Sequence, residues 1–328
     1  MATFILIDTM NLAFRVRHGM RAPDMHTTVG LAIHTIFNSV KKVWTQFDGS
    51  NCVFALEGRS WRKDYYAPYK AHRRDAAQQR TQEEKDDDQI FFQAMDDLIR
   101  FLTKKTNASV LRSANAEADD MIARWIQLHP QDQHVIVSTD SDFHQLLAPN
   151  VKVYNGIAGM LYTHNGVWDK DGNPALNKQS QPLGVPNPAL LLFEKIIRGD
   201  PGDNVMSAYP GVRKTKIHQA FENRHEQGYA WNNLMLTKWT DHQGHEIRVR
   251  DAYERNRILI DLTAQPVNFV EQFDQSIQEV IHQPQKTQVG TALMQFANAW
   301  GLLKIEKNAR DYSVCLSRPY EGVLLNKQ

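Results

Sequence analysis

Three short apolar runs, each ending on an acid, constrain the fold of this chain more than any other feature. They read FILID (residues 4–8), CVFALE (52–57) and VIVSTD (135–140). β-Branched, aromatic and aliphatic residues dominate all three, as is typical of buried strands. A carboxylate is costly beside a buried strand unless a cation or a hydrogen-bond donor accompanies it. The fold must therefore supply a partner for each of these acids.

Helical patterns lie between the predicted strands. Apolar residues recur at spacings of three and four over residues 29–47, and four apart over residues 89–102. Alternation of strands with helices predicts an α/β fold, in which helices cover both faces of a mostly parallel central sheet. Ligands of such sheets bind beyond the carboxyl ends of the strands. We therefore expect Asp8, Glu57 and Asp140 to meet at one edge of the sheet.

The second half of the chain reads differently. Residues 165–188 are rich in Gly, Pro and Asn, which predicts a connection from a main domain (1–187) into a mostly helical unit (188–283). A hairpin is expected within residues 239–249. Residues 284–328 form a C-terminal extension to which the sequence assigns no role. It contains an expected amphipathic helix near 288–303, followed by YSVCL as a candidate strand.

The overall composition excludes several classes of protein. The 328 residues carry a net charge of +1, so an anionic partner must meet local basic patches rather than a global field. No apolar stretch approaches the roughly 20 residues of a membrane span, and the N-terminus lacks the features of a signal peptide. The two distant cysteines suit a reducing compartment. These features predict a cytoplasmic protein that does not contact membranes.

Two further acid clusters join the strand-end acids. One lies in NAEADDMIARWI (115–126) and the other in RGDPGDN (198–204). Taken singly, the first is an ordinary set of helix-dipole partners and the second a solvated turn. Taken together with Asp142, the acids number nine, and a single sheet edge could gather all of them: Asp8, Glu57, Glu117, Asp119, Asp120, Asp140, Asp142, Asp200 and Asp203.

Nine anions share a cleft only if cations separate them, because like charges at short range repel strongly. Hard oxygen ligands without paired Cys or His select Mg²⁺, for which Mn²⁺ can substitute. Two or more such ions would activate a water and stabilise the leaving oxygen in phosphodiester hydrolysis. One alternative takes the DSD at 140–142 as the D-x-D of aspartate-nucleophile phosphatases, but that motif would normally follow the first strand. A zinc site at HQGH (242–245) is disfavoured because no Cys pair accompanies it.

A basic segment follows Glu57 directly. RSWRKDYYAPYKAHRRDAAQQR (59–80) holds seven Lys or Arg against two Asp, interleaved with Trp61, Tyr65, Tyr66 and Tyr69. Basic side chains beside stackable rings suit single-stranded nucleic acid, although a solvated basic helix is the ordinary alternative. The next residues, TQEEKDDD (81–88), are acidic. We interpret the segment as a nucleic-acid contact with one basic and one acidic limb.

Five fragments in order resemble one known family. They are LIDTMNLAFR (6–15), WRKDYYAPYKAHRR (61–74), AEADDMIA (116–123), STDSDFHQLL (138–147) and IIRGDPGDN (196–204). Over residues 3–265 the chain resembles the 5′-nuclease superfamily, specifically the bacteriophage flap endonucleases and 5′–3′ exonucleases. The resemblance implies a PIN-like domain with a helical arch at about 61–115, followed by a helix-hairpin-helix subdomain at 188–283. It further implies a set of metal-site acids: Asp8, Glu117, Asp119, Asp120, Asp140, Asp142, Asp200 and Asp203.

The resemblance also assigns basic and aromatic residues. Lys70 and Arg73 fall on the basic pair at the base of the arch, through or beneath which a 5′ strand passes; with Asp140 and Asp142 they are the expected catalytic residues. We place this pair three apart on one helical face. Tyr69 matches an aromatic residue that stacks near the scissile nucleotide, and Lys195 matches a second basic residue near the site.

The segment YPGVRKTK (209–216) resembles the family's helix-hairpin-helix, in which backbone amides grip duplex phosphates. Its expected DNA-binding residues are Gly211, Lys214 and Lys216, and a monovalent cation is a further candidate ligand there. The chain departs from the family at two positions: Glu57 replaces an Asp, and Arg213 stands where the hairpin normally has its second Gly.

These features together imply a metal-dependent nuclease that cuts DNA flaps and 5′ ends, and the RNA of RNA–DNA hybrids as a further substrate. Such an enzyme would serve primer removal in replication, as a monomer with a replication protein as a candidate partner. The alternative is a nucleic-acid-binding protein of the same fold with weakened catalysis, as the departures at Glu57 and Arg213 would allow.

Overall fold

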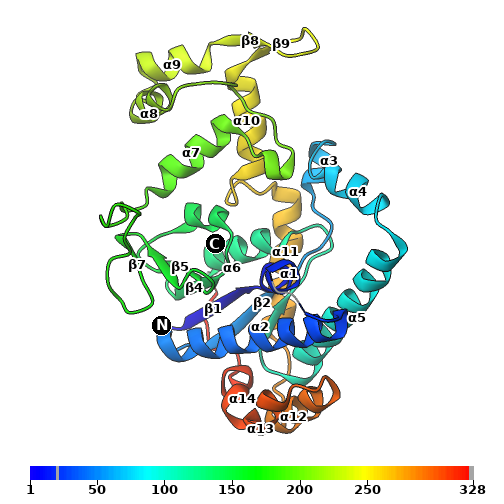
Figure 1. Cartoon of the computed structure of the whole chain (residues 1–328). Helices are drawn as coiled ribbons and strands as arrows, with labels where there is room; N and C mark the ends of the chain where they lie inside the picture. Colours follow the sequence, from blue (N-terminus) through cyan, green and yellow to red (C-terminus); the bar gives the residue numbers. More distant parts are fainter. Residues whose placement is uncertain (20–21, 325–328) are drawn as a thin grey trace.

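A seven-stranded sheet forms the centre of the protein (Figure 1). The computed structural model describes residues 1–19 and 22–324. The strand order is β3-β2-β1-β4-β5-β6-β7; the first five strands are parallel, and β6 and β7 are antiparallel to their neighbours. The predicted α/β class with a mostly parallel sheet is confirmed. The strands are β1 (Thr3–Asp8), β2 (Asn51–Ala55), β3 (Ser109–Leu111), β4 (Gln133–Val137), β5 (Val151–Asn155), β6 (Met160–Thr163) and β7 (Gly166–Trp168).

Helices cover both faces of the sheet because its central strands are apolar on both sides. Ile5 and Ile7 of β1 pack in one core with side chains of α2 and α5, whereas Phe4 and Leu6 pack in a second core with α6 and α11. This alternation follows from the two-residue period of a strand. The helices on these faces are α1 (Thr9–Gly19), α2 (Met25–Phe47), α5 (Gln82–Lys105), α6 (Ala118–Leu128) and α11 (Val267–Ile281).

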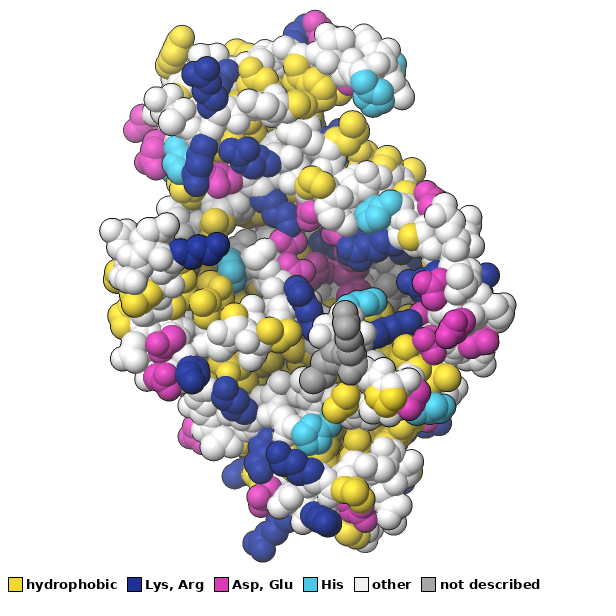
Figure 2. All heavy atoms as spheres, viewed as in Figure 1, with side chains coloured by type: hydrophobic (Ala, Val, Ile, Leu, Met, Phe, Trp, Pro, Cys, Tyr) yellow, Lys and Arg dark blue, Asp and Glu magenta, His cyan; other side chains and the backbone are white. Residues whose placement is uncertain are grey.

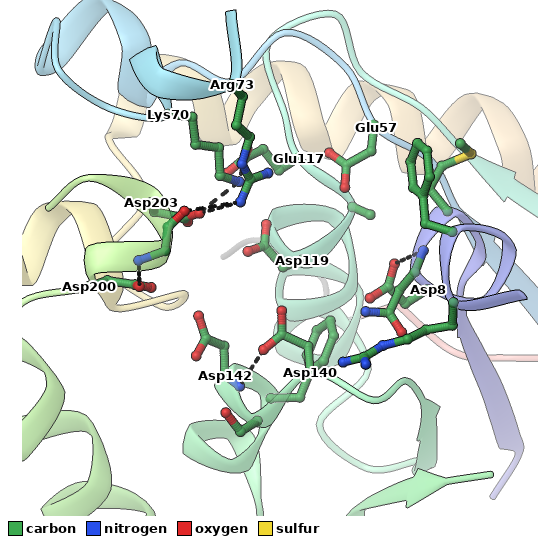
Figure 3. Close-up of a pocket in the computed structure, with 18 of the residues that line it drawn as sticks. Asp8, Glu57, Lys70, Arg73, Glu117, Asp119, Asp140, Asp142, Asp200 and Asp203 are labelled. Carbon is green, nitrogen blue, oxygen red and sulfur yellow. Dashed lines mark hydrogen bonds and ion pairs between the residues drawn. The ribbon is translucent and has the colours of Figure 1, made fainter. Parts of the chain in front are cut away.

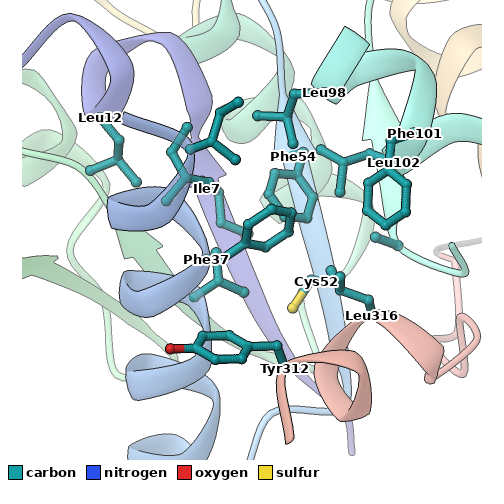
Figure 4. Close-up of a cluster of buried hydrophobic side chains, with 14 of the residues drawn as sticks. Ile7, Leu12, Phe37, Cys52, Phe54, Leu98, Phe101, Leu102, Tyr312 and Leu316 are labelled. Carbon is teal, nitrogen blue, oxygen red and sulfur yellow. The ribbon is translucent and has the colours of Figure 1, made fainter. Parts of the chain in front are cut away.

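The C-terminal segment completes the first core. It contains α12 (Val289–Ala299), α13 (Leu303–Lys307) and α14 (Ala309–Ser317). Figure 4 shows Tyr312 and Leu316 beside Phe37 and Cys52. The expected helix near 288–303 is present, but the strand expected at YSVCL is wrong. Its buried residues, Tyr312, Cys315 and Leu316, are spaced by three and four and therefore form one face of a helix.

A second, smaller core lies beyond the sheet (Figure 1). Phe193, Ile217 and Phe221 fill it, and the expected hairpin is present as β8 (Lys238–Thr240) and β9 (Glu246–Arg248). The unit expected at 188–283 also included α11, but Phe273 and Ile277 of that helix belong to the core of the sheet. The helices of the smaller unit are α7 (Pro188–Arg198), α8 (Lys214–Glu222), α9 (Tyr229–Met235) and α10 (Val249–Ile260).

The arch is shorter than predicted. It consists of α3 (Arg62–Tyr65), α4 (Ala71–Gln78) and the first part of α5 (Figure 1). No residue of α4 is buried, and the first buried residue of α5 is Phe91. The range expected for the arch also included β3, which pairs with β2 inside the sheet. The exposed part of the arch therefore ends near Phe91.

The register of the parallel strands brings the strand-end acids together. Asp8 of β1 pairs with Ala55 of β2, and Ile7 pairs with Val137 of β4. Glu57 lies two residues past the end of β2, and Asp140 three residues past the end of β4. Two short 3₁₀ helices, η1 (Ser141–Leu146) and η2 (Pro201–Asp203), carry further acids to the same edge.

None of the helices in residues 1–19 and 22–324 combines the length and apolarity needed to cross a membrane.

The docking of α14 can be tested with Leu316→Ala. Leu316 is fully buried, so the substitution should leave a cavity and lower the free energy of unfolding by about 2–5 kcal/mol. Val314→Ala on the same helix is the matched control: Val314 is 48% exposed, and its loss should cost less than about 0.5 kcal/mol. Urea unfolding measures both. Equal small costs for the two variants would contradict the packing of α14 on the sheet.

Candidate active site

A cavity of about 870 Å³ opens at the carboxyl edge of the sheet, between the strand ends, the arch and α7. Figure 2 shows it as a hollow in which acidic side chains are flanked by Lys and Arg. Acids of the sheet edge and of η2 reach it from different elements (Figure 3). Eight of the nine acids expected from the sequence line this cavity: Asp8, Glu57, Glu117, Asp119, Asp140, Asp142, Asp200 and Asp203.

Asp8 is the most enclosed of the strand-end acids, at 7% exposure. Its carboxylate accepts hydrogen bonds from Ser138 Oγ at 2.9 Å and from the backbone N–H of Asn11 at 3.4 Å. Burial outweighs these donors and raises the pKa of Asp8 to about 6. The metal-free cavity therefore favours a protonated Asp8 at mildly acidic pH.

Glu57 lines the cavity beyond the end of β2, on the same side of the view as Asp8 (Figure 3). Water reaches this side chain, but the surrounding walls withdraw part of its hydration. This desolvation, followed by the charge of Glu117, raises the pKa of Glu57 to about 7. The longer side chain that departs from the family's Asp thus still delivers its carboxylate to the cavity.

Asp140 and Asp142 follow β4. The carboxylate of Asp140 caps η1 by accepting the N–H of Asp142 at 2.9 Å. Asp142 forms an ion pair with Lys195 of α7, whose Nζ also lies 2.8 Å from Asp200 Oδ2. Burial raises the pKa of Asp142 against the pull of Lys195. Burial also acts to raise the pKa of Asp200, but the hydrogen bond and charge of Lys195, together with backbone hydrogen bonds from Gly202 and Asp203, outweigh it and lower that pKa.

A second cation lies between acids at the arch base. Lys70 Nζ is 2.5 Å from Glu117 Oε1 and 3.5 Å from Asp203 Oδ2, and Arg73 Nη2 is 2.7 Å from Asp203 Oδ1. Burial lowers the pKa of Lys70, but Glu117 and Asp203 outweigh it and raise that pKa above its ordinary value. The placement of Lys70 and Arg73 on one helical face is wrong, because Lys70 precedes α4 with a left-handed backbone (φ 52°). The two side chains nevertheless converge on Asp203 (Figure 3).

Asp119 lies between these two groups of acids (Figure 3). It belongs to the first turn of α6, and its Oδ1 accepts the N–H of Asp120 at 2.7 Å. Burial raises its pKa although Arg62 opposes the shift. Asp119 is therefore in position to contact a cation bound by the acids around Lys195 or by the acids around Lys70.

Two expected site residues have other positions. Asp120 is fully buried and lies outside the cavity, where both of its oxygens accept hydrogen bonds from Arg62, so it is not placed to be a metal ligand. Tyr69 is 3% exposed, and its hydroxyl donates toward Glu117 and Asp203. Because its ring is enclosed, stacking of Tyr69 on a nucleotide is contradicted. Trp61 is buried as well, which leaves Tyr65 as the most exposed ring of the basic segment.

The cavity wall also holds polar residues that were not among the expected site residues. Arg15 donates from Nε to Thr139 Oγ1 at 2.8 Å, and Asn11 accepts from the backbone N–H of Thr139 at 3.1 Å. Both residues occur in LIDTMNLAFR (6–15), the first fragment that resembles the family, and that fragment could have indicated them as site residues. Further lining residues are basic: His18, Lys63 and Arg74.

The donor set of the cavity fits hard divalent cations. Carboxylate oxygens dominate it, and no cysteine lines the cavity. Within the described part of the chain, no three acids, histidines or cysteines form a closed ligand group; the acids instead stand in pairs around Lys70 and Lys195. The same finding gives no support to a zinc site at 242–245. A cation would therefore bind by drawing acids of neighbouring pairs toward itself.

The segment expected to grip duplex DNA joins α7 to α8. Gly211 has φ 70°, a conformation that favours glycine. Arg213 has φ −70° and ψ 141°, which any residue adopts, so its replacement of a second glycine causes no backbone strain. The side chain of Lys214 is 66% exposed and lies 3.5 Å from Glu194, while Lys216 lies over the ring of Tyr209.

The enclosure of Asp8 predicts a pH-dependent stability of the metal-free protein. The folded-state pKa of about 6 exceeds the ordinary value of 3.8, so the folded protein holds a proton that the unfolded chain has lost. Stability should therefore fall as pH rises through this window. Replacing Asp8 by Asn should reduce the fall between pH 5 and pH 8 by about 1–1.5 kcal/mol. Urea unfolding in EDTA measures this, with Asp171→Asn in an exposed loop as control; identical slopes for Asp8→Asn and wild type would contradict the shift.

Comparison with known proteins shows which family this chain belongs to. A family model described as the 5′-3′ exonuclease, N-terminal resolvase-like domain, matches residues 3–172. A flap endonuclease of Escherichia phage T5 is 27% identical over 204 residues, covering 61% of this chain and 63% of the relative. The flap endonuclease Xni of Psychromonas ingrahamii is 26% identical over 259 residues, covering 75% of this chain and 88% of the relative.

The fold is also found in solved structures. A bacteriophage T5 flap endonuclease, crystallised as a pseudo-enzyme–product complex with DNA and metal ions, superposes with a TM-score of 0.59 at 20% identity. The superposition covers 86% of this chain and all of the other. The match of the family model extends over more than half of the chain and includes the strand-end acids, the arch and the start of α6. The protein therefore belongs to the family defined by the 5′-3′ exonuclease N-terminal, resolvase-like domain.

Proposed function

We propose that the protein is a metal-dependent, structure-specific 5′ nuclease. It would act as a flap endonuclease and 5′–3′ exonuclease on DNA, near junctions between a 5′ single strand and a duplex. The observation that carries this proposal is the meeting of eight acids with Lys70, Arg73 and Lys195 in one cavity at the base of the arch. Membership of the exonuclease family supports it.

The acids of the cavity would hold the metal ions. We propose Mg²⁺, with Mn²⁺ as substitute, bound by Asp8, Glu57, Asp140 and their neighbours in the cavity. Two ions bound to such carboxylates supply an activated water and neutralise the leaving oxygen. Because the pKa values of Asp8 and Glu57 are raised, binding of a cation to these carboxylates would release the protons that they hold.

The basic residues have a separate role in this proposal. Lys70, Arg73 and Lys195 now contact acids that a metal ion would also attract. With those acids bound to an ion, Lys70, Arg73 and Lys195 would become available to a phosphate in the cavity. They would then offset the charge that develops on the transferring phosphoryl group. Their position fits a 5′ strand that passes beneath α4, which has no buried residue of its own.

The hairpin between α7 and α8 would hold the duplex. Its backbone amides near Gly211 and the ammonium groups of Lys214 and Lys216 provide donors for phosphates without sequence preference. A monovalent cation at this hairpin stays a prediction. Action as a monomer, cleavage of RNA in hybrids, a replication-protein partner and a cytoplasmic location also stay predictions.

If the two acids that follow β4 bind metal ions, Asp140→Asn and Asp142→Asn should each impair cleavage. Each variant should lose Mg²⁺-supported cleavage of a 5′-labelled flap, because a carboxylate ligand at the central strand end is missing. Binding of the flap in EDTA should survive and can tighten, since one repulsive charge is gone. Asp171→Asn is the control that should cleave like wild type. Normal turnover by either site variant would exclude its proposed role, and an inactive wild type would favour a binding protein of the same fold.

The proposed role of Lys70 predicts a loss of rate rather than of affinity. Lys70→Ala should lower single-turnover cleavage by about 10²-fold or more, as for other preorganised electrostatic donors. Flap affinity should fall much less because the contacts of the hairpin remain. Lys85→Ala is the matched control, an exposed lysine of the same arch that does not line the cavity. Equal small losses in rate and affinity would make Lys70 a binding residue only.

A further inference from the structure

The two carboxylate oxygens of Glu117 have different surroundings. Oε2 accepts hydrogen bonds from Tyr69 Oη at 2.7 Å and from Arg62 Nη1 at 3.3 Å. Oε1 contacts the Nζ of Lys70 at 2.5 Å, on the side that faces the cavity (Figure 3). Two buried donors thus hold one oxygen, whereas the other has a partly exposed ammonium group as its partner.

Arg62 is itself firmly anchored. Its side chain is 1% exposed and donates from Nη1 and Nη2 to the two oxygens of Asp120 at 2.8 and 2.9 Å. Its Nε donates to the carbonyl oxygen of Leu259, near the end of α10, at 2.8 Å. One guanidinium therefore connects the arch base, the start of α6 and the end of α10. Asp120, which lies outside the cavity, is the counterion that makes this burial possible.

The hydroxyl of Tyr69 provides a second fixed donor. Its single proton is shared between Glu117 Oε2 and Asp203 Oδ2, which lies 3.0 Å from Oη, so the hydroxyl bridges an acid of the segment that starts α6 and an acid of η2. The ring is enclosed by Ile196, Val205 and Leu259, which prevents it from turning away. The packing of the ring therefore sets the position of this hydroxyl.

We propose that Arg62 and Tyr69 are positioning residues that fix Glu117 through Oε2 and thereby present Oε1 to a divalent cation. This inference rests on the metal-dependent function proposed above and adds two residues outside the ligand set. A glutamate has three side-chain torsions, and a carboxylate without such donors must lose that freedom when it binds a metal. Removal of an outer partner of a metal ligand typically lowers metal affinity by about 10–100-fold.

Tyr69→Phe is the smallest test, because it removes one hydroxyl and keeps the packing of the ring. The affinity of the whole protein for Mn²⁺, measured by calorimetry without DNA, should fall by about 10-fold or more. Tyr66→Phe is the matched control: its neighbouring ring packs against the Tyr69 cluster, and it should change Mn²⁺ affinity by less than about twofold. Flap binding in EDTA should be unchanged in both variants.

A double variant tests Arg62. Arg62→Met alone would leave Asp120 as an unpaired buried charge and would be strongly destabilising. Arg62→Met combined with Asp120→Asn removes both charges and keeps the side-chain oxygen that accepts the backbone N–H of Glu117. We expect this variant to lose Mn²⁺ affinity by about 10-fold or more and single-turnover rate with it.

The control for the double variant lies on the same helix. Arg124 of α6 donates to both oxygens of Asp274 of α11, at 2.5 and 2.9 Å, and does not line the cavity. Arg124→Met with Asp274→Asn removes a two-hydrogen-bond Arg–Asp pair that is somewhat more exposed, and it should leave Mn²⁺ affinity within about twofold of wild type. A loss of affinity in both double variants would indicate a general effect on α6 and overturn the role of Arg62.

The outcomes separate the two proposals. A wild-type protein that neither binds Mn²⁺ nor cleaves a flap would contradict the proposed function itself. A wild type that does both, with unchanged Mn²⁺ affinity in Tyr69→Phe, would contradict the positioning role alone. If the Arg62 double variant fails to fold, thermal unfolding will show it, and the Mn²⁺ affinity of Tyr69→Phe then decides between the two outcomes.

Discussion

Repulsion among the acids at the sheet edge is the constraint on which the rest of this structure depends. Parallel strands place their carboxyl ends side by side, and here three successive neighbours, β2, β1 and β4, all lead to acids. The fold offsets this charge with side chains from outside the sheet. Lys70 and Arg73 come from the arch, and Lys195 comes from α7. Their ion-pair partners are acids that surround the strand ends: Glu117 and Asp203 for the arch, and Asp142 and Asp200 for α7.

This arrangement gives the same cations two uses. In the absence of metal they neutralise acid pairs, and in the proposed reaction they would contact phosphate. An ammonium group that must exchange partners is held less firmly than a buried guanidinium, which agrees with the exposures of 15% for Lys70 and 1% for Arg62. The structure therefore separates basic residues that can exchange partners from one that anchors the site.

The sequence was sufficient to predict the three central strands β1, β2 and β4, the helices α2 and α5 and the gathering of acids, because each leaves a local pattern. A strand reads as a continuous apolar run, and its terminal acid is adjacent in the chain. Contacts between distant segments leave no such pattern. Nothing local distinguishes Asp120 from Asp119, yet the partner of Asp120 is Arg62, 58 residues away. The enclosure of Tyr69 likewise depends on α7 and α10, so its local sequence wrongly favours stacking on a nucleotide.

The error at α14 has a similar origin. YSVCL is rich in residues that favour strands, but its surroundings in the fold select the helix that buries Tyr312, Cys315 and Leu316 together. The local propensity is outweighed by a surface that α12 forms together with α2 and β2, two elements that lie far earlier in the chain. Burial against a distant helix is information that a short window of sequence does not contain.

The small cluster of Tyr69, Ile196, Val205, Leu259 and Ile260 joins the arch base to α7 and α10. The hairpin proposed to hold the duplex continues from α7, and the residues proposed to face the scissile phosphate continue from Tyr69. Both therefore extend from one packed block. In the proposed function, this shared block would set the number of nucleotides between the gripped duplex and the cut bond, and the base sequence of the substrate would have no part in it.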